Sequence, residues 1–324
     1  MTISTHFEKT TDQISDPLPS WNEGAAKQAI IEFVQTTTDK SSPNYVEPGD
    51  RIATFDQDGT LWVEHPFYSQ AIFALDRLKS LAPQYPEWQT QEPFKSILEG
   101  NQDAIAKLTE GDLVQIVAAT HAGMTTEEFI KIAKDWQITA KHPRFQKLYT
   151  ELVYQPMREV LQYLQANGFK TYIVTGGGQE FVRIYSDRVY DIPAEQVIGS
   201  SIATKYDDQD GKFVLVREPK IFFINDNAGK PTGINLFIGK RPIAAFGNSD
   251  GDRQMLEYTQ AGNGMRLALL VLHDDEKREY AYGPVKGLPD TKVGRFTQTL
   301  HDQSQQNGWI VVSMKNDWKR IFAF

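Results

Sequence analysis

Residues 51–60 read RIATFDQDGT, and this stretch decides the fold. Its first half is a short, mostly apolar run, and its second half gathers Asp56, Asp58 and Gly59. A buried strand that ends in a turn is typical of this pattern, because apolar side chains fill the faces of a parallel sheet whereas Asp and Gly favour turns. We therefore expect a strand over 51–55 that is followed by a loop with two carboxylates.

Two later apolar runs end in the same way. Residues 171–174 (TYIV) lead into Thr175 and three glycines, and residues 242–246 (PIAAF) lead into the acidic loop 247–252 (GNSDGD). Helical patterns lie between these runs, and strands that alternate with helices imply an α/β fold, a parallel sheet with helices on both faces. Ligands bind at the carboxyl ends of such strands. The three polar loops are therefore expected to meet at one edge of the sheet.

The remaining chain divides into three parts. Residues 1–22 are mostly polar and predict a loose N-terminal arm. Residues 62–155 carry helical signals and few strand signals, so we expect a helical cap inserted after the first strand. Residues 23–61 and 156–324 then form the core domain, in which 201–224 predict a hairpin around an Asp/Gly turn.

Apolar periodicity and turn residues place further elements. Helices are expected at 26–34, at 156–168 and at about 179–190, and additional strands at 266–272 and 309–312. The sequence leaves two possibilities for the last 60 or so residues, which either complete the sheet or pack on the cap.

The composition argues against several classes of function. With 34 Lys+Arg against 42 Asp+Glu the formal net charge is −8, which argues against nucleic-acid binding, because an acidic surface repels phosphate backbones. Cysteine is absent, so disulfides, thiolate metal sites and a cysteine nucleophile are excluded. No stretch approaches the about 18–20 apolar residues of a membrane helix, and no secretory signal is visible. We expect a cytoplasmic chain as given, or a periplasmic or secreted one if it is a processed form. Its oligomeric state is left open.

The carboxylates of Asp56 and Asp58 lie close in sequence and repel each other unless a cation sits between them. Mg²⁺ is bound by oxygen ligands and suits such a site. One carboxylate can then attack phosphorus while the other handles a proton. The alternative is a turn in which Asp and Gly serve only local hydrogen bonds.

The other loops add complementary groups. Thr175, Gly176 and Gly177 offer a hydroxyl and backbone N–H groups as an anion site, or else a turn that needs glycine. The loop 247–252 offers oxygen ligands, or again only a turn. Lys230 precedes a proline at a predicted helix start, where a lysine is either functional or simply solvated.

Taken together, the segments Asp56-Gln-Asp58-Gly-Thr60, Thr175-Gly-Gly, Lys230 and Gly247-Asn248-x-x-x-Asp252 resemble the haloacid dehalogenase superfamily. The likeness is greatest to its phosphoserine-phosphatase-like phosphatases and spans roughly residues 50–260. It implies a Rossmann-like three-layer core in which Asp56 is the nucleophile and Asp58 is the general acid and base. Thr175 would bind the phosphoryl group and Lys230 would neutralise its charge. A carboxylate at the position of Asp58 favours a phosphatase over a dehalogenase.

The resemblance also implies a Mg²⁺ site made by Asp56, Asp58, Asn248 and Asp252. Family members usually carry Asp where this chain has Asn248, which still offers an oxygen but removes a negative charge. We expect weaker Mg²⁺ binding or a larger contribution from Asp252, with Asp250 as a further candidate.

The cap is expected to exclude water and select the substrate. Candidate substrate contacts are Glu64 and His65, with His121, His142 and Arg144 as further possibilities or as ordinary structural residues. The function expected from these features is hydrolysis of a small phosphomonoester through an aspartyl-phosphate. A mutase-like phosphoryl transfer and a non-catalytic phosphate-binding protein are the alternatives. Phosphoserine, pyrophosphate, sugar phosphates and nucleotides all remain open as substrates.

Overall fold

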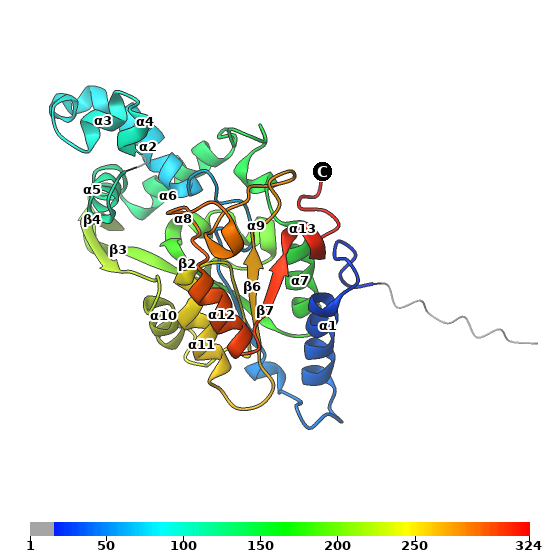
Figure 1. Cartoon of the computed structure of the whole chain (residues 1–324). Coiled ribbons are helices and arrows are strands. Elements are labelled where there is room, and N and C mark those ends of the chain that lie inside the picture. The colour runs from blue at the N-terminus through cyan, green and yellow to red at the C-terminus, as the bar shows by residue number, and fades with distance from the viewer. Residues whose placement is uncertain (1–15, 106) are drawn as a thin grey trace, which may run out of the picture.

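The computed structural model describes residues 16–105 and 107–324 and has one seven-stranded sheet of order β4-β3-β2-β1-β5-β6-β7 (Figure 1). The strands are β1 (Ile52–Phe55), β2 (Lys170–Gly178), β3 (Val197–Gln209), β4 (Lys212–Phe223), β5 (Ala244–Gly247), β6 (Leu267–Leu272) and β7 (Ile310–Ser313). Neighbouring strands are parallel except in the β3–β4 hairpin. The predicted α/β class is confirmed, and the strand over 52–55 lies at the centre of the sheet.

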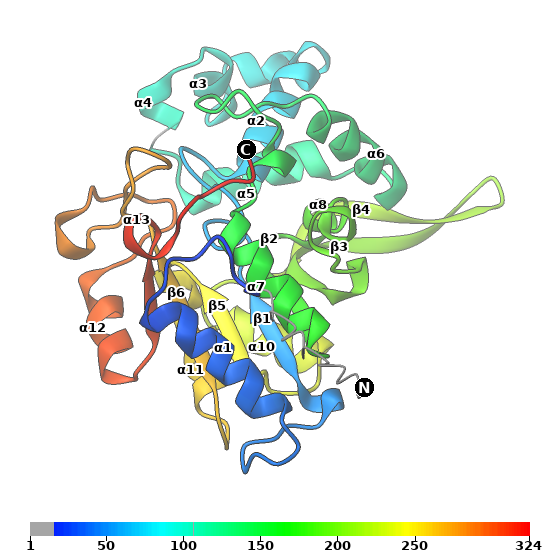
Figure 2. The ribbon, with the colours of Figure 1, turned by 90° about the vertical axis from the view of Figure 1, so that its right-hand side faces the viewer.

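Helices cover both faces of this sheet, as expected for three layers. One face packs against α1 (Ala25–Thr38), α7 (Gln155–Ala166) and α9 (Ser186–Tyr190), of which α1 and α7 lie in front of the sheet in Figure 2. The other face packs against α10 (Gly229–Phe237), α11 (Arg253–Gln260) and α12 (Gln298–Gln306). Two shorter helices, α8 (Gln179–Arg183) and α13 (Met314–Asp317), follow β2 and β7.

Strand β6 shows how one apolar run serves both layers. Leu267, Leu269 and Val271 belong to the apolar cluster that includes α1 and α7. The alternating residues Leu270 and Leu272 belong to the cluster on the opposite face. Because successive side chains in a strand point to opposite faces, a continuous apolar sequence is what a strand buried on both faces requires.

The segment between β1 and β2 is helical, as predicted. It contains α2 (Ser69–Leu81), α3 (Phe94–Leu98), α4 (Gln102–Ile105), α5 (Glu110–His121) and α6 (Thr126–Gln137). In Figure 2 these helices lie above the sheet. The capping box expected at α6 is present, with Thr125 and Glu128 bonded reciprocally. Helices α2, α3, α4 and α5 contribute to a small apolar cluster of their own, and the boundary of a cap domain at 62–155 stays a prediction.

The structure differs from the sequence-based expectations at three points. Strand β2 continues through the glycines to Gly178, with a register shift after Val174, because β3 pairs with the glycine segment. The helix expected over 179–190 is divided into α8 and α9. Part of the predicted loose arm is packed on the core, since Leu18 and Trp21 are fully buried. Residues 1–15 of that predicted arm lie outside the described residues.

The C-terminal residues complete the sheet and also pack on the predicted cap segment, where Arg144 donates to the Glu279 carbonyl and the Phe145 ring contacts Phe322. Both possibilities left by the sequence are therefore realised. Strands β6 and β7 extend the sheet beyond β5, and the segment between them brings His273 and Tyr282 to the carboxyl end of β1. Among the described residues, no helix combines the length and apolarity needed to cross a bilayer.

Candidate active site

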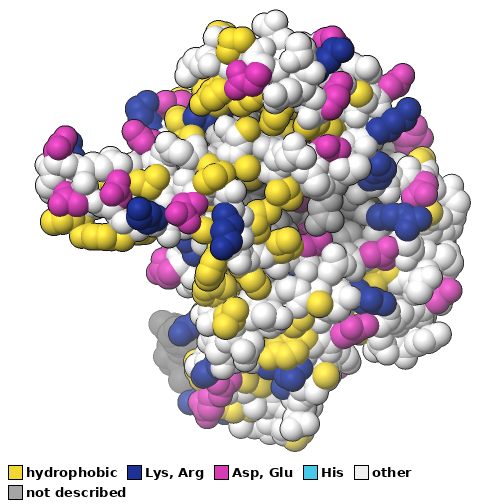
Figure 3. All heavy atoms as spheres, turned by 90° about the vertical axis from the view of Figure 1, so that its left-hand side faces the viewer, with side chains coloured by type: hydrophobic (Ala, Val, Ile, Leu, Met, Phe, Trp, Pro, Cys, Tyr) yellow, Lys and Arg dark blue, Asp and Glu magenta, His cyan; other side chains and the backbone are white. Residues whose placement is uncertain are grey.

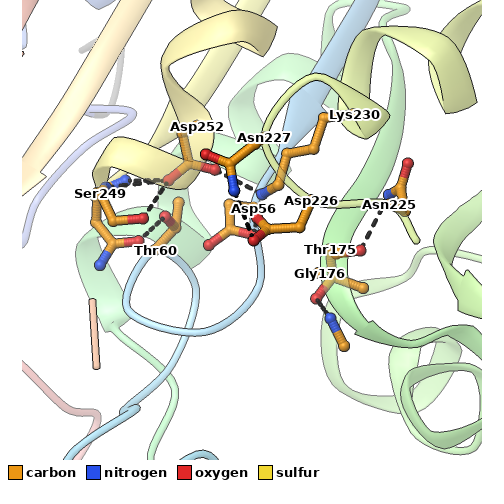
Figure 4. A network of polar contacts seen from close by, with 12 residues as sticks. Asp56, Thr60, Thr175, Gly176, Asn225, Asp226, Asn227, Lys230, Ser249 and Asp252 are labelled. Carbon is orange, nitrogen blue, oxygen red and sulfur yellow. Dashed lines mark hydrogen bonds and ion pairs between the residues drawn. The ribbon is translucent and has the colours of Figure 1, made fainter. Parts of the chain in front are cut away.

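The polar residues at the carboxyl ends of β1, β2 and β5 meet at one edge of the sheet, as Figure 4 shows for Asp56, Thr175 and Ser249. Three adjacent parallel strands bring them together. Lys230 reaches the same point from the first turn of α10. The four segments singled out in the sequence therefore share one site.

Lys230 joins two carboxylates at the centre of this site. Its Nζ lies 2.5 Å from Oδ1 of Asp56 and 2.6 Å from Oδ1 of Asp252. All three side chains are buried. Burial and the nearby Asp252 carboxylate raise the pKa of Asp56, while Lys230 opposes this shift. Although burial disfavours its charge, the two carboxylates raise the pKa of Lys230, which therefore remains an ammonium ion between them.

Asp58 is oriented by a neighbouring indole. Nε1 of Trp62 donates to Oδ1 of Asp58 at 2.8 Å. Burial raises the pKa of Asp58 to about 6, although the Trp62 hydrogen bond and Lys230 work in the opposite direction. A carboxyl group with this pKa exchanges a proton readily near neutral pH.

Gly59 is required by the turn between these carboxylates and Thr60. Its φ of +76° lies in the left-handed region. A Cβ atom there would also stand 2.2 Å from Nδ2 of Asn248 and 2.3 Å from Oε1 of Glu64. The glycine thus permits close approach of three chain segments.

The Thr175 loop is bonded to both the hairpin and the cap. Oγ1 of the buried Thr175 accepts from the Gly177 N–H at 3.0 Å, and the Gly178 N–H donates to Oε1 of Gln70 on α2 at 2.7 Å. The Gly176 carbonyl accepts from Ser200 Oγ at 2.7 Å. Gly176 and Gly177 both line the cavity beside Asp56.

In the acidic loop, the Asp252 side chain is held by the backbone N–H groups of neighbouring loop residues. Its Oδ2 accepts from the N–H groups of Asn248 and Ser249, at 2.9 and 3.0 Å. Its Oδ1 is bonded to Lys230. Both oxygens of Asp252 therefore have partners. Asp250 accepts from Thr297 Oγ1 at 2.8 Å.

The Asn248 amide is fixed by two neighbours. Nδ2 donates to Oε1 of Glu64 at 2.7 Å, and Oδ1 accepts from Thr60 Oγ1 at 3.2 Å. Glu64 is buried and also accepts from the Tyr282 hydroxyl at 2.7 Å. Burial, together with Asp58 and Asp56, raises the pKa of Glu64. A carboxylate next to Nδ2 sets the orientation of the amide, because only the NH₂ group can donate to it.

The donor set fits a magnesium ion. Asp56, Asp58 and Asn248 carry oxygen atoms of the kind that bind Mg²⁺, which in proteins is commonly held by one or two carboxylates together with water. No group of three or more His, Cys, Asp and Glu side chains within residues 16–105 and 107–324 is arranged to hold a metal ion.

The predicted substrate contacts divide into two groups. Glu64 and His121 line the cavity, whereas His65, His142 and Arg144 lie outside its lining. Nε2 of His65 is 3.1 Å from the Val293 carbonyl, so this side chain contacts the loop before α12. His142 contacts the backbone of His65, and Arg144 donates to backbone carbonyls.

Sequence reasoning missed several residues of the site. Asp226 and Gln70 line the cavity, and Tyr282 bonds to Glu64. Asp226 lies four positions before Lys230 in the segment INDNAGK, and this proximity is the signal that would have found it. The other two residues have no local signal, because they reach the site from the cap and from beyond β6.

The sequence pattern of the haloacid dehalogenase-like hydrolase family matches residues 51–212, half of the chain. This chain therefore belongs to the haloacid dehalogenase-like hydrolases.

One solved structure shares the fold at low identity, and two others match this chain with lower TM-scores. A conserved, functionally unknown protein from Anaerococcus prevotii DSM 20548 is 16% identical, with a TM-score of 0.56 over 83% of this chain and 94% of that one. A protein of unknown function from Bordetella pertussis Tohama I is 16% identical, with a TM-score of 0.47 over 81% and 98%. A phosphoserine phosphohydrolase-like protein from Francisella tularensis subsp. tularensis SCHU S4 is 20% identical, with a TM-score of 0.38 over 70% and 89%. None of the curated proteins matches this chain.

Proposed function

We propose that this hydrolase is a magnesium-dependent phosphatase, which cleaves a small phosphomonoester through an aspartyl-phosphate on Asp56. The observation that carries the proposal is the buried bridge of Lys230 between Asp56 and Asp252, at the carboxyl end of the central strand. Phosphoryl transfer needs in-line positioning and positive charge around the oxygens more than elaborate covalent chemistry. The bridge supplies a positioned carboxylate and a permanent cation together.

In the first half-reaction Asp56 attacks phosphorus, and the bond from phosphorus to the ester oxygen breaks. Oδ1 of Asp56 is bonded to Lys230, so Oδ2 is the attacking atom. Asp58 gives its proton to the departing oxygen, which leaves as an alcohol. Lys230 and the Thr175 hydroxyl hold the oxygens of the transferring group.

In the second half-reaction the ionised Asp58 takes a proton from water, which attacks the phosphorus of the aspartyl-phosphate. The bond to Asp56 breaks, inorganic phosphate leaves, and Asp58 ends protonated for the next cycle. A pKa of about 6 allows Asp58 to serve both steps.

The residues that would hold Mg²⁺ are Asp56, Asp58 through its backbone carbonyl, and Asn248 through Oδ1. The bound ion supplies charge neutralisation on the phosphoryl oxygens. Glu64 supports this site by taking the NH₂ group of Asn248, which leaves the amide oxygen as the ligand atom. Asp252 positions Lys230 and the backbone of the acidic loop.

The test is release of phosphate from p-nitrophenyl phosphate, with Mg²⁺ and with a chelator. We expect turnover that requires Mg²⁺ and is lost in Asp56→Asn. Asp50→Asn is the control, because that carboxylate lies on the surface just before β1 and is paired with Lys240. Equal yields of phosphate and nitrophenol indicate hydrolysis, whereas nitrophenol without phosphate indicates transfer to another acceptor. Turnover retained in Asp56→Asn would refute the proposed nucleophile.

A further inference from the structure

The cavity that contains Asp56 extends well beyond the space where a phosphate reacts. It has a volume of about 360 Å³ and lies between the cap helices and the β3–β4 hairpin. Ligand sites of roughly 300–1,000 Å³ accommodate small organic molecules. The reaction proposed for Asp56 and Asp58 uses one end only.

Away from that end the walls are apolar on both sides. The apolar lining includes Ala74 and Leu75 of α2, Val117 of α5, and the paired residues Ile202 and Ile221 of the hairpin. Phe181 of α8 also lines this part. An apolar wall favours apolar ligand surface, and it leaves hydroxyl, amino or carboxylate groups of a ligand without partners.

The charged residues in the apolar part are engaged with each other. Arg217 and Glu180 line it, with Nη1 of Arg217 3.4 Å from Oε2 of Glu180. Nε of Arg217 donates to the His121 carbonyl at 2.7 Å, and its guanidinium lies 4.0 Å from the Phe129 ring centre. Of the described lining residues, Lys230 is the other Lys or Arg, and it is bonded to Asp56 and Asp252. Nη1 of Arg217 makes no hydrogen bond within the described residues, but the Glu180 carboxylate already balances the charge of the guanidinium. A second anionic group on the ligand would therefore have to compete with Glu180 for Arg217.

The two walls are joined to each other before any ligand binds. The N–H of Arg217 on β4 donates to the Met124 carbonyl at 2.8 Å, and the Gly123 N–H donates to the Arg217 carbonyl at 2.8 Å. Backbone bonds between the end of α5 and the hairpin thus fix the width of the cavity. A preformed apolar site loses little ordering free energy when a ligand enters.

The rim of the cavity is apolar as well. Val114 of α5 and Ile224 after β4 line the cavity and are 37% and 50% exposed. Figure 3 shows apolar side chains spread over this face of the molecule. A ligand with an apolar body meets compatible surface from the mouth of the cavity inward.

From these walls we propose that the substrate is a phosphomonoester of an apolar alcohol, whose hydrocarbon or aromatic body lies between α2, α5 and the β3–β4 hairpin. This inference rests on the proposed phosphatase reaction. It separates the substrate from phosphorylated amino acids and sugars, whose polar groups would face Leu75 and Val117 without partners.

The test is a series of straight-chain alkyl phosphates from ethyl to hexyl, with phosphoserine and glucose 6-phosphate for comparison. Burial of each methylene group should raise kcat/KM about fourfold. The four additional methylene groups of hexyl phosphate should therefore raise kcat/KM about 250-fold over ethyl phosphate. The two polar esters should not exceed ethyl phosphate. In Val117→Asn the ratio of hexyl to ethyl kcat/KM should fall at least tenfold, whereas Leu236→Asn on the exposed surface of α10 should leave it unchanged.

The outcomes separate the two proposals. Turnover of p-nitrophenyl phosphate without any dependence on chain length overturns the apolar substrate and leaves the phosphatase intact. The same conclusion follows if phosphoserine or another ester with a distal carboxylate is preferred over hexyl phosphate. Absence of turnover with every ester overturns both. The alkyl series uses the native protein, so its result does not depend on whether a variant folds.

Discussion

Removing Lys230 should be among the most damaging single changes to this protein. The substitution Lys230→Met keeps most of the side-chain volume but removes the ammonium ion that lies 2.5 Å from Asp56 and 2.6 Å from Asp252. The lysine side chain is 2% exposed, so water does not replace it. Breaking one partner of a buried ion pair costs about 3–5 kcal/mol of unfolding free energy, because a buried charge is left uncompensated.

The assay is urea unfolding at pH 7, followed by tryptophan fluorescence. The matched control is Lys240→Met, which removes a surface ion pair with Asp50 of the same 2.6 Å length, and in which the lysine is 52% exposed. An exposed pair contributes about 0–1 kcal/mol, so the two variants should differ by several kcal/mol. Equal losses in the two variants would refute the reasoning.

The pH dependence gives a second check on the same variant. Burial and Asp252 raise the pKa of Asp56 above its ordinary value of 3.8. Between pH 3.8 and that raised pKa, Asp56 therefore binds more protons in the folded state than in the unfolded state. Stability then increases as the pH falls through this window. The unfolding free energy that Lys230→Met loses relative to the native protein should be smaller in mild acid. Adding Asp252→Asn should recover part of that lost free energy at pH 7.

Three further predictions concern other parts of the site. Gly59→Ala should abolish phosphatase activity and lower the melting temperature, since a Cβ would meet Asn248 at 2.2 Å. The control Gly49→Ala, where a Cβ has nothing within 4 Å, should change neither property. An active Gly59→Ala variant would contradict the account. Glu64→Ala should weaken Mg²⁺ binding about 10–100-fold by calorimetry, because partners of metal ligands orient them; unchanged affinity would show that Glu64 does not orient Asn248. Burial, with Arg217 nearby, lowers the pKa of His121 to about 3, so this side chain binds more protons in the unfolded state below pH 6.5, and the contribution of His121 to the unfolding free energy should fall by about 2 kcal/mol from pH 7 to 5. His121→Phe should remove this contribution from the pH dependence of the unfolding free energy, measured by urea titrations at several pH values. An unaltered pH dependence would show that other groups cause it.

The sheet and its loops were predictable because they rest on local signals. The run that ends at Asp56 is apolar on both faces, and a Gly-containing loop follows it, so strand and turn are defined within ten residues. The same holds for the strand that ends before Asn248. Parallel topology then brings the loops together without any further information. These are the parts of the fold that the structure confirms.

The supporting contacts were not predictable, because they join residues far apart in the chain. Glu64, which was expected to contact substrate and which lines the cavity, also bonds to Asn248, 184 positions away, and to Tyr282, 218 positions away. His65, the other expected substrate contact, lies against the Val293 carbonyl, although its sequence surroundings give no sign of this. The apolar walls of the cavity likewise come from α2, α5 and the hairpin, which pack together only in three dimensions.

The account depends most directly on a covalent phosphoryl group at Asp56. The protein should be mixed with Mg²⁺ and p-nitrophenyl phosphate, quenched during turnover with borohydride, and digested for mass analysis. An aspartyl-phosphate is reduced to homoserine, so the account predicts homoserine at position 56 and unmodified aspartate at 58 and 252. Steady turnover with aspartate intact at 56, or with homoserine at another position, would contradict it.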